Sequence, residues 1–231
     1  MKATWSRSRQ PGFTNGGIIN RKLEIGDRRS EVRCLMSDVR CPMSDLIPPT
    51  SYLTPMFLEK LKHIKAFILD VDGVMTNGML LVTESGEFLR QFNIKDGYAL
   101  QLAVKRGFKI AVVSGARSKG VEHRLRGLGI KDIYLGLDSK TAAYNEFIEK
   151  NALLPEQVLF MGDDIPDLEL MKMAGLAVCP ADAVEEIKAV AHYISPKNGG
   201  DSCVRDIIEK VLKIQNLWSN ADPSATDGSK I

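Results

Sequence analysis

The sequence lacks long hydrophobic runs and has few cysteines and histidines, and each shortage excludes a class of protein. No apolar stretch approaches the roughly 20 residues that a helix needs to cross a bilayer, so we expect no membrane partner. The 4 cysteines form no C-x-x-C pair, and the 3 histidines show no metal-ligand spacing. A disulfide framework or a zinc site is therefore not expected, and the pattern favours the reducing cytoplasm.

An excess of charge of either sign is also missing. Lys and Arg together number 31, and Asp and Glu together number 29, for a formal net charge of +2. This balance gives no electrostatic reason to expect nucleic acid as the partner. What is present is a globular composition, with 44% hydrophobic and 26% charged residues in a chain of 231. That length allows one sizeable domain with appendages.

The two ends of the chain differ from its middle. Residues 1–55 show no sustained apolar period and are rich in Arg, Ser, Pro and Gly, so they cannot bury enough apolar surface to offset the entropy of ordering. We predict a disordered extension, or a spurious one if translation starts at Met36, Met43 or Met56; a targeting arm is the functional alternative. The polar residues 219–231 predict a flexible tail. One folded domain, residues 56–218, remains.

Within that domain, short apolar runs alternate with helical periods. The runs predict strands at 66–71, 109–114, 132–136, 157–162 and 176–179. The periods between and after them predict helices at 97–106, 119–128, 140–151, 166–174, 183–191 and 204–215. Fully apolar strands alternating with helices predict the α/β class, with a doubly wound, Rossmann-like parallel sheet covered on both faces. Residues 79–93 break the pattern and predict a β-hairpin after the first strand, because two extended runs flank 84–86.

Chemically active residues follow the predicted strands at their carboxyl ends. Asp70 and Asp72 lie in DVDGVMT, Ser114 in VVSG and Asp163 in MGDD, while Lys140 begins a helix. A parallel sheet brings such strand ends to one edge. Clustered carboxylates repel one another unless a cation lies among them, and oxygen ligands without nearby His or Cys suit Mg²⁺. The sequence therefore predicts a magnesium site at this edge.

This predicted site suits phosphoryl transfer. The cation and Lys140 can neutralise a phosphate dianion, while the Ser114 hydroxyl and loop amides bond its oxygens. One Asp can then attack as nucleophile and form an aspartyl-phosphate. A carboxyl two residues later can protonate the leaving alkoxide and afterwards activate water. Taken singly, these residues have structural explanations, since Asp-Gly is a common turn and Asp163, Asp164 or Asp167 can cap a helix.

The segments DVDGVMT, VVSG and GDDIPD, with the isolated Lys140, resemble in order and spacing the four motifs of the haloacid dehalogenase superfamily of phosphatases. The finer resemblance is to the capless 3-deoxy-D-manno-octulosonate 8-phosphate phosphatases. It is carried by DVDGVMTNG, FNIKDGYALQLA and KNGGDSCVRDIIEKVL. The resemblance implies Mg²⁺-dependent hydrolysis of that sugar-acid phosphate, a step toward lipopolysaccharide, through an aspartyl-phosphate intermediate in a homotetramer.

The resemblance also implies roles for individual residues. Asp70 would be the nucleophile and Asp72 the general acid/base, with Ser114 and Lys140 binding the phosphate. Mg²⁺ would be held by Asp70, the main-chain carbonyl of Asp72, and Asp163. The substrate-binding residues expected are Asp72, Asn93, Ile94, Lys95, Asp96, Gly97, Ser114, Gly115, Arg124 and Lys140. Two alternatives stay open: Asp96 can be a helix N-cap, and Arg124 can lie on a solvated helix face rather than meet a substrate carboxylate at a subunit boundary.

The predicted domain has no room for a lid. Residues 71–113 are used by the hairpin and one helix, yet phosphoryl transfer benefits from excluding water. We therefore expect a neighbouring subunit to cover the site. Gly199 and Gly200, with Arg205, are candidates for a flexible segment that reaches that neighbour.

Two other functions remain open on the sequence alone. Asn77, Gln101 and Ala116 stand where related sequences often carry other residues, and this leaves the sugar uncertain. A nine-carbon compound, 2-keto-3-deoxynonulosonate 9-phosphate, is the nearest alternative substrate. A non-catalytic oligomerisation module of the same fold is the alternative from another class, and the complete set of motif residues argues against it.

Overall fold

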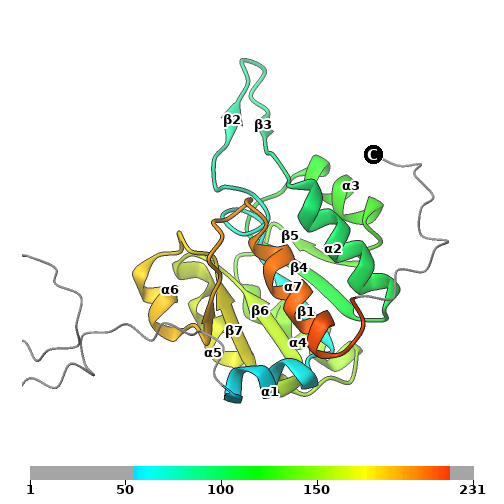
Figure 1. Cartoon of the computed structure of the whole chain (residues 1–231). Helices are drawn as coiled ribbons and strands as arrows, with labels where there is room; N and C mark the ends of the chain where they lie inside the picture. The colour runs from blue at the N-terminus through cyan, green and yellow to red at the C-terminus, as the bar shows by residue number, and fades with distance from the viewer. Residues whose placement is uncertain (1–54, 219–231) are drawn as a thin grey trace, which may run out of the picture. The chain divides into compact units, whose positions relative to one another are not determined.

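The computed structural model describes residues 55–218, in which helices cover both faces of a six-stranded parallel sheet (Figure 1). The strand order is β5-β4-β1-β6-β7-β8. Their bounds are β1 Ala66–Leu69, β4 Lys109–Ser114, β5 Asp132–Leu135, β6 Val158–Met161, β7 Leu176–Cys179 and β8 Tyr193–Ile194. The chain moves outward from β1 through β4 to β5 and then returns to the other side of β1 at β6. This confirms the doubly wound sheet; the expectations for residues 1–54 and 219–231 lie outside the described residues.

The helices divide between two cores on opposite faces of the sheet. Helices α1 (Pro55–His63), α2 (Ile94–Lys105), α3 (Lys119–Gly127) and α7 (Cys203–Ile214) pack on one face. Helices α4 (Lys140–Lys150), α5 (Leu168–Met173) and α6 (Glu185–Val190) pack on the other. Because side chains alternate along a strand, Phe67 and Leu69 of β1 enter the first core and Ala66 and Ile68 the second. Both faces of β1 are thus buried, which explains its continuous apolar run.

Several elements begin or end differently from the sequence prediction. Helix α2 starts at Ile94 rather than at 97, because the Asn93 side chain accepts a hydrogen bond from Lys95 N at 2.8 Å. The alternative that Asp96 caps this helix is therefore wrong. Helix α1, strand β8 and two short 3₁₀ turns, Pro155–Gln157 and Ile165–Asp167, were not predicted. They are short elements whose order comes from packing against the sheet rather than from a strong local pattern.

The hairpin between β1 and α2 is present as an antiparallel pair, β2 (Leu81–Val82) and β3 (Phe88–Leu89). Gly86 closes its turn with a φ of +80°, which favours glycine. The pair projects away from the domain (Figure 1). Its apolar side chains are exposed: Met79, Leu80, Leu81, Val82, Phe88 and Leu89. No inserted lid domain lies between β1 and β4 in the described chain, as the sequence predicted.

The Gly199-Gly200 segment packs against the loop that follows β1 in the same chain. Gly200 N donates to Val74 O at 3.0 Å. A Cβ atom at Gly199 would lie only 1.9 Å from Gly73 O, so glycine is needed for this close approach of two backbones. The expectation that these two glycines form a flexible segment is therefore wrong, whereas their contact with a neighbouring subunit stays a prediction.

A buried carboxyl group, Asp96, lies where α2 meets the start of α7. Its Oδ1 accepts a hydrogen bond from Arg205 N at 2.7 Å, while no described residue donates to its Oδ2. Burial raises the pKa of Asp96 from 3.8 to about 6, and the charge of Asp201 adds to this, against the opposing hydrogen bonds from Arg205 and Ser202 and the charge of Arg205. The carboxyl is thus more easily protonated in the folded chain than in the unfolded one.

This pKa predicts a pH-dependent contribution to stability. Because the folded pKa lies above 3.8, the contribution is fully present below pH 4 and is lost as the pH rises through 6. A shift of this size corresponds to on the order of 3 kcal/mol. Asp96→Asn should therefore remove that part of the decline in unfolding free energy between pH 4 and pH 8, measured by urea denaturation. A variant with the same decline as the wild type would contradict the assignment.

Candidate active site

Three carboxylates from two strand ends converge at the carboxyl edge of the sheet. Asp70 follows β1, and Asp163 and Asp167 follow β6. One oxygen of each lies within 4.8 Å of the others. The cluster forms because β1 and β6 are parallel neighbours with Leu69 opposite Met161, which brings the two following loops side by side.

Lys140, at the first turn of α4, reaches into this cluster. Its Nζ lies 3.0 Å from Asp70 Oδ1 and 2.7 Å from Asp167 Oδ1. The ammonium group is nearly buried. Burial alone would lower its pKa, but the charges of Asp70 and Asp167 outweigh that effect and raise it. Lys140 therefore stays charged in the site.

Asp167 is fully buried and positions two of the other residues. While its Oδ1 accepts from Lys140, its Oδ2 accepts from Asp163 N at 3.1 Å. The sequence suggested only a cap or a supporting group for Asp167. Its contact with Lys140, 27 residues away, depends on the tertiary fold.

Asp163 presents an oxygen with no protein partner. Its Oδ1 is buried, and none of the described residues donates a hydrogen bond to it. The carboxylate lies tightly against Gly73, where a Cβ atom would be 2.0 Å from Asp163 Oδ2. Gly73 also has a φ of +87°, so the loop after β1 needs glycine to pass over this carboxylate.

The charges in the cluster do not balance. Three carboxylates face one ammonium group, so the ionised cluster carries an excess of two negative charges. Burial raises the pKa of Asp163, and the neighbouring carboxylates raise it further, to about 7. Burial and Asp167 raise the pKa of Asp70 as well, although Lys140 opposes them. A bound divalent cation would remove this repulsion.

The residues present fit a magnesium ion. The cluster offers carboxylate oxygens only, the donor type that Mg²⁺ prefers, with no nitrogen or sulfur ligand among them. The unpaired Asp163 Oδ1 is a ready ligand. Asp70 and Asp163, both predicted from the sequence, are the residues we expect to hold the ion, and Asp167 lies beside them.

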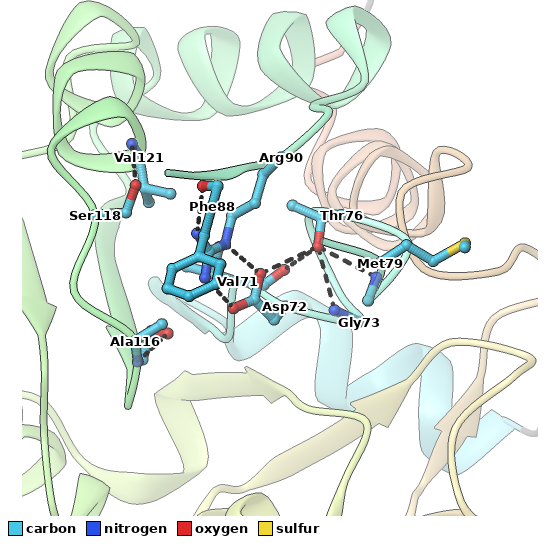
Figure 2. Close-up of polar contacts among 12 residues, drawn as sticks. Val71, Asp72, Gly73, Thr76, Met79, Phe88, Arg90, Ala116, Ser118 and Val121 are labelled. Carbon is cyan, nitrogen blue, oxygen red and sulfur yellow. Dashed lines mark hydrogen bonds and ion pairs between the residues drawn. The ribbon is translucent and has the colours of Figure 1, made fainter. Parts of the chain in front are cut away.

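Asp72 points its carboxylate to a different partner. Arg90 donates from Nε to Asp72 Oδ1 at 2.7 Å and from Nη2 to Asp72 Oδ2 at 3.0 Å (Figure 2). Thr76 Oγ1 lies 3.4 Å from Asp72 Oδ1. The side chain of Asp72 is thus not part of the carboxylate cluster, which is compatible with a separate role in proton transfer.

A cavity of about 740 Å³ opens over these residues. Six of the predicted site residues line it: Asp70, Asp72, Ser114, Gly115, Lys140 and Asp163. The predicted substrate contacts at 93–97 and Arg124 do not line it. Asn93 instead donates from Nδ2 to Gly200 O at 3.2 Å, and the Arg124 guanidinium occupies the space where Gly97 would carry a Cβ atom. Their role in substrate binding stays a prediction.

Known proteins resemble this chain in sequence and in structure. A family model described as haloacid dehalogenase-like hydrolase matches residues 129–207. The 3-deoxy-D-manno-octulosonate 8-phosphate phosphatase KdsC of Salmonella typhimurium is 36% identical over 169 residues, 73% of this chain and 90% of that protein. The corresponding phosphatase structure from Yersinia pestis has a TM-score of 0.71 at 33% identity and covers 73% of this chain and 91% of that one. A Moraxella catarrhalis phosphatase, solved with magnesium, phosphate and KDO, has a TM-score of 0.70 at 33% identity. The match covers 72% of this chain and 95% of that chain.

Proposed function

The chain belongs to the haloacid dehalogenase-like hydrolases, in the branch of the 3-deoxy-D-manno-octulosonate 8-phosphate phosphatases, and we propose that it hydrolyses 3-deoxy-D-manno-octulosonate 8-phosphate to the free sugar acid and phosphate. The observation that carries this proposal is the complete phosphoryl-transfer set around one cavity in a chain that matches 90% of the Salmonella phosphatase. The reaction would serve lipopolysaccharide synthesis in the cytoplasm.

In this proposal Asp70 attacks the phosphorus atom and becomes an aspartyl-phosphate. Asp70 is suited to this because it lines the cavity and is held by Lys140. Asp72 donates a proton to the leaving sugar alkoxide and then takes one from the attacking water. Lys140 and the hydroxyl of Ser114 bind the non-bridging phosphate oxygens.

Mg²⁺, when bound by Asp70 and Asp163, would supply the positive charge that lets a carboxylate approach a phosphate dianion. The main-chain carbonyl of Asp72 is the third protein ligand that we propose. Asp167 orients Asp163 and Lys140 through its two oxygens and thereby keeps the site in shape before substrate arrives.

Phosphate release from two sugar acids tests the substrate. We expect 3-deoxy-D-manno-octulosonate 8-phosphate to give a kcat/KM at least about tenfold above that of 2-keto-3-deoxynonulosonate 9-phosphate, both assayed with Mg²⁺. The nine-carbon compound is the second candidate, because the sugar contacts predicted at 93–97 and at Arg124 do not line the cavity among the described residues. Preference for an unrelated phosphate ester would contradict both. No turnover of any ester would favour the non-catalytic module, against which the complete residue set argues.

We further propose a homotetramer, and the hairpin supports it. Leu81 and Phe88 are 67% and 59% exposed on a projecting two-stranded ribbon, and an isolated pair of strands is marginally stable in water. Burial of these side chains against other subunits would remove that apolar surface from water. The same contact would bring a neighbour close to the open site.

Leu81→Glu should therefore dissociate the assembly to smaller species in sedimentation velocity, because it places a charge in the apolar contact. Leu154→Glu is the matched control, since Leu154 is 61% exposed before β6, at the amino edge of the sheet. We expect Leu154→Glu to leave the oligomer unchanged. An oligomer that survives Leu81→Glu would rule out the hairpin as its contact.

A further inference from the structure

Most of the Arg90 side chain is covered, although the segment around it is exposed. Arg90 follows β3 directly, and the strands of the hairpin are exposed, yet only 6% of the Arg90 side chain is accessible. Burying an arginine is unfavourable unless its charge is paired and its donors are bonded. The position of this side chain therefore depends on the specific partners that it meets.

Both ends of the guanidinium are held. Nε and Nη2 donate to the two oxygens of Asp72 in a bidentate pair, and Nη1 donates to Phe88 O at 3.2 Å (Figure 2). The bidentate geometry fixes the plane of the carboxylate as well as its distance, which a lysine at the same place would not do. The bond to Phe88 ties the same group to the base of the hairpin.

We propose that Arg90 is a positioning residue that sets the orientation of the Asp72 carboxylate and links it to the hairpin. The inference rests on the proposed function, in which Asp72 transfers protons to and from the reacting oxygens. Asp70 and Asp72 are two residues apart on one loop, so the side-chain direction of Asp72 decides whether it turns toward the carboxylate cluster or toward the leaving group. Arg90 fixes that direction away from the cluster.

The link has a consequence for the hairpin. Because Arg90 is bonded to both Phe88 and Asp72, a displacement of the hairpin base moves the guanidinium relative to the carboxylate. Docking of the hairpin would therefore affect proton transfer and not only the exclusion of water. Substrate binding through the phosphate, which uses Ser114 and Lys140, would be largely unaffected.

Two substrates with different leaving groups distinguish a role of Arg90 in proton transfer from a purely structural role. An alkyl phosphate needs its leaving oxygen protonated, whereas p-nitrophenyl phosphate releases a weakly basic phenolate that does not. We expect Arg90→Ala to lower kcat/KM for 3-deoxy-D-manno-octulosonate 8-phosphate or β-glycerophosphate by about 10- to 100-fold, within the range for an impaired acid/base. The loss for p-nitrophenyl phosphate should be less than about threefold. Arg90→Lys should recover part of the loss, since lysine keeps the positive charge but cannot form the bidentate hydrogen bonds.

A double-mutant cycle measures whether Arg90 acts through Asp72. In an Asp72→Asn background, Arg90→Ala should cause little additional loss on the alkyl phosphate. Arg126→Ala is the matched control, because Arg126 makes similarly short contacts to Glu122 on the exposed surface of α3 and should behave as wild type. Equal losses on both esters, or additive losses in the cycle, would overturn the inference. A wild-type protein inactive on every ester would instead overturn the proposed function, and the inference with it.

Discussion

Asp70→Asn should lower kcat by at least about 10⁴-fold, the scale on which loss of a covalent nucleophile is felt. The amide keeps the shape of the carboxylate but cannot form the aspartyl-phosphate. The fold should remain intact, because burial and the charge of Asp167 raise the pKa of Asp70, and a neutral side chain removes both unfavourable effects. In EDTA we therefore expect a melting temperature no lower than that of the wild type, while Lys140 keeps its bond to Asp167.

Asp138→Asn is the control for this experiment. Asp138 lines the same cavity but is exposed and lies outside the carboxylate cluster, so its loss should change kcat by less than about fivefold. Phosphate release is measured with saturating Mg²⁺ for all three proteins. Appreciable activity in Asp70→Asn would mean that another group attacks the phosphorus atom.

Mg²⁺ should stabilise the folded protein strongly, because it neutralises a cluster with two excess negative charges. A ligand at 100 times its dissociation constant adds about 2.7 kcal/mol to the free energy of unfolding. For a domain of this size that corresponds to a rise of roughly 5–10 °C in melting temperature. Removal of the ion with EDTA should abolish phosphatase activity, and added Mg²⁺ should restore it.

Asp163→Asn should reduce that rise to less than about 2 °C, since Asp163 provides the unpaired oxygen of the cluster. Asp138→Asn again provides the comparison and should show the full rise. Differential scanning fluorimetry across a Mg²⁺ titration measures both variants. An equal rise in Asp163→Asn and the wild type would place the ion elsewhere.

The principal site residues could be predicted because reactive side chains stand in the sequence where the predicted strands end. Asp70, Ser114 and Asp163 each follow an apolar run that reads as a buried strand, and parallel strands end at one edge. The sheet order then brings Asp70 and Asp163 together through the β1–β6 pairing. The first step requires no knowledge of long-range contacts, whereas the second depends on the doubly wound topology.

Arg90 and Asp167 could not be predicted from the sequence, because their roles depend on contacts with residues far away along the chain. Arg90 lies at the end of the predicted hairpin, where no local pattern marks it as a site residue, and its partner is 18 residues away. Asp167 has the sequence position of a helix cap, and only burial beside Lys140 shows its second role. For both, the available signal was a charged residue near a motif, which is common on protein surfaces. A buried charge becomes apparent only when the fold shows what surrounds it.

The glycines illustrate the same limit. Gly199 and Gly200 suggested flexibility, because glycine is permissive in an isolated chain. In the fold they allow the backbone to approach Gly73 and Val74 closely, and a hydrogen bond from Gly200 N to Val74 O holds the segment there. The start of helix α2 shows the same limit. The helix begins at Ile94 rather than at 97, because one local hydrogen bond makes Asn93 its N-cap.

A crystal structure of the protein with Mg²⁺ and beryllium fluoride, a mimic of the phosphoryl group, tests the account most directly. We expect the fluoride adduct on a carboxylate oxygen of Asp70, with one cation contacting both Asp70 and Asp163. An adduct on a different residue, or a Mg²⁺ ion that contacts neither carboxylate, would contradict the account.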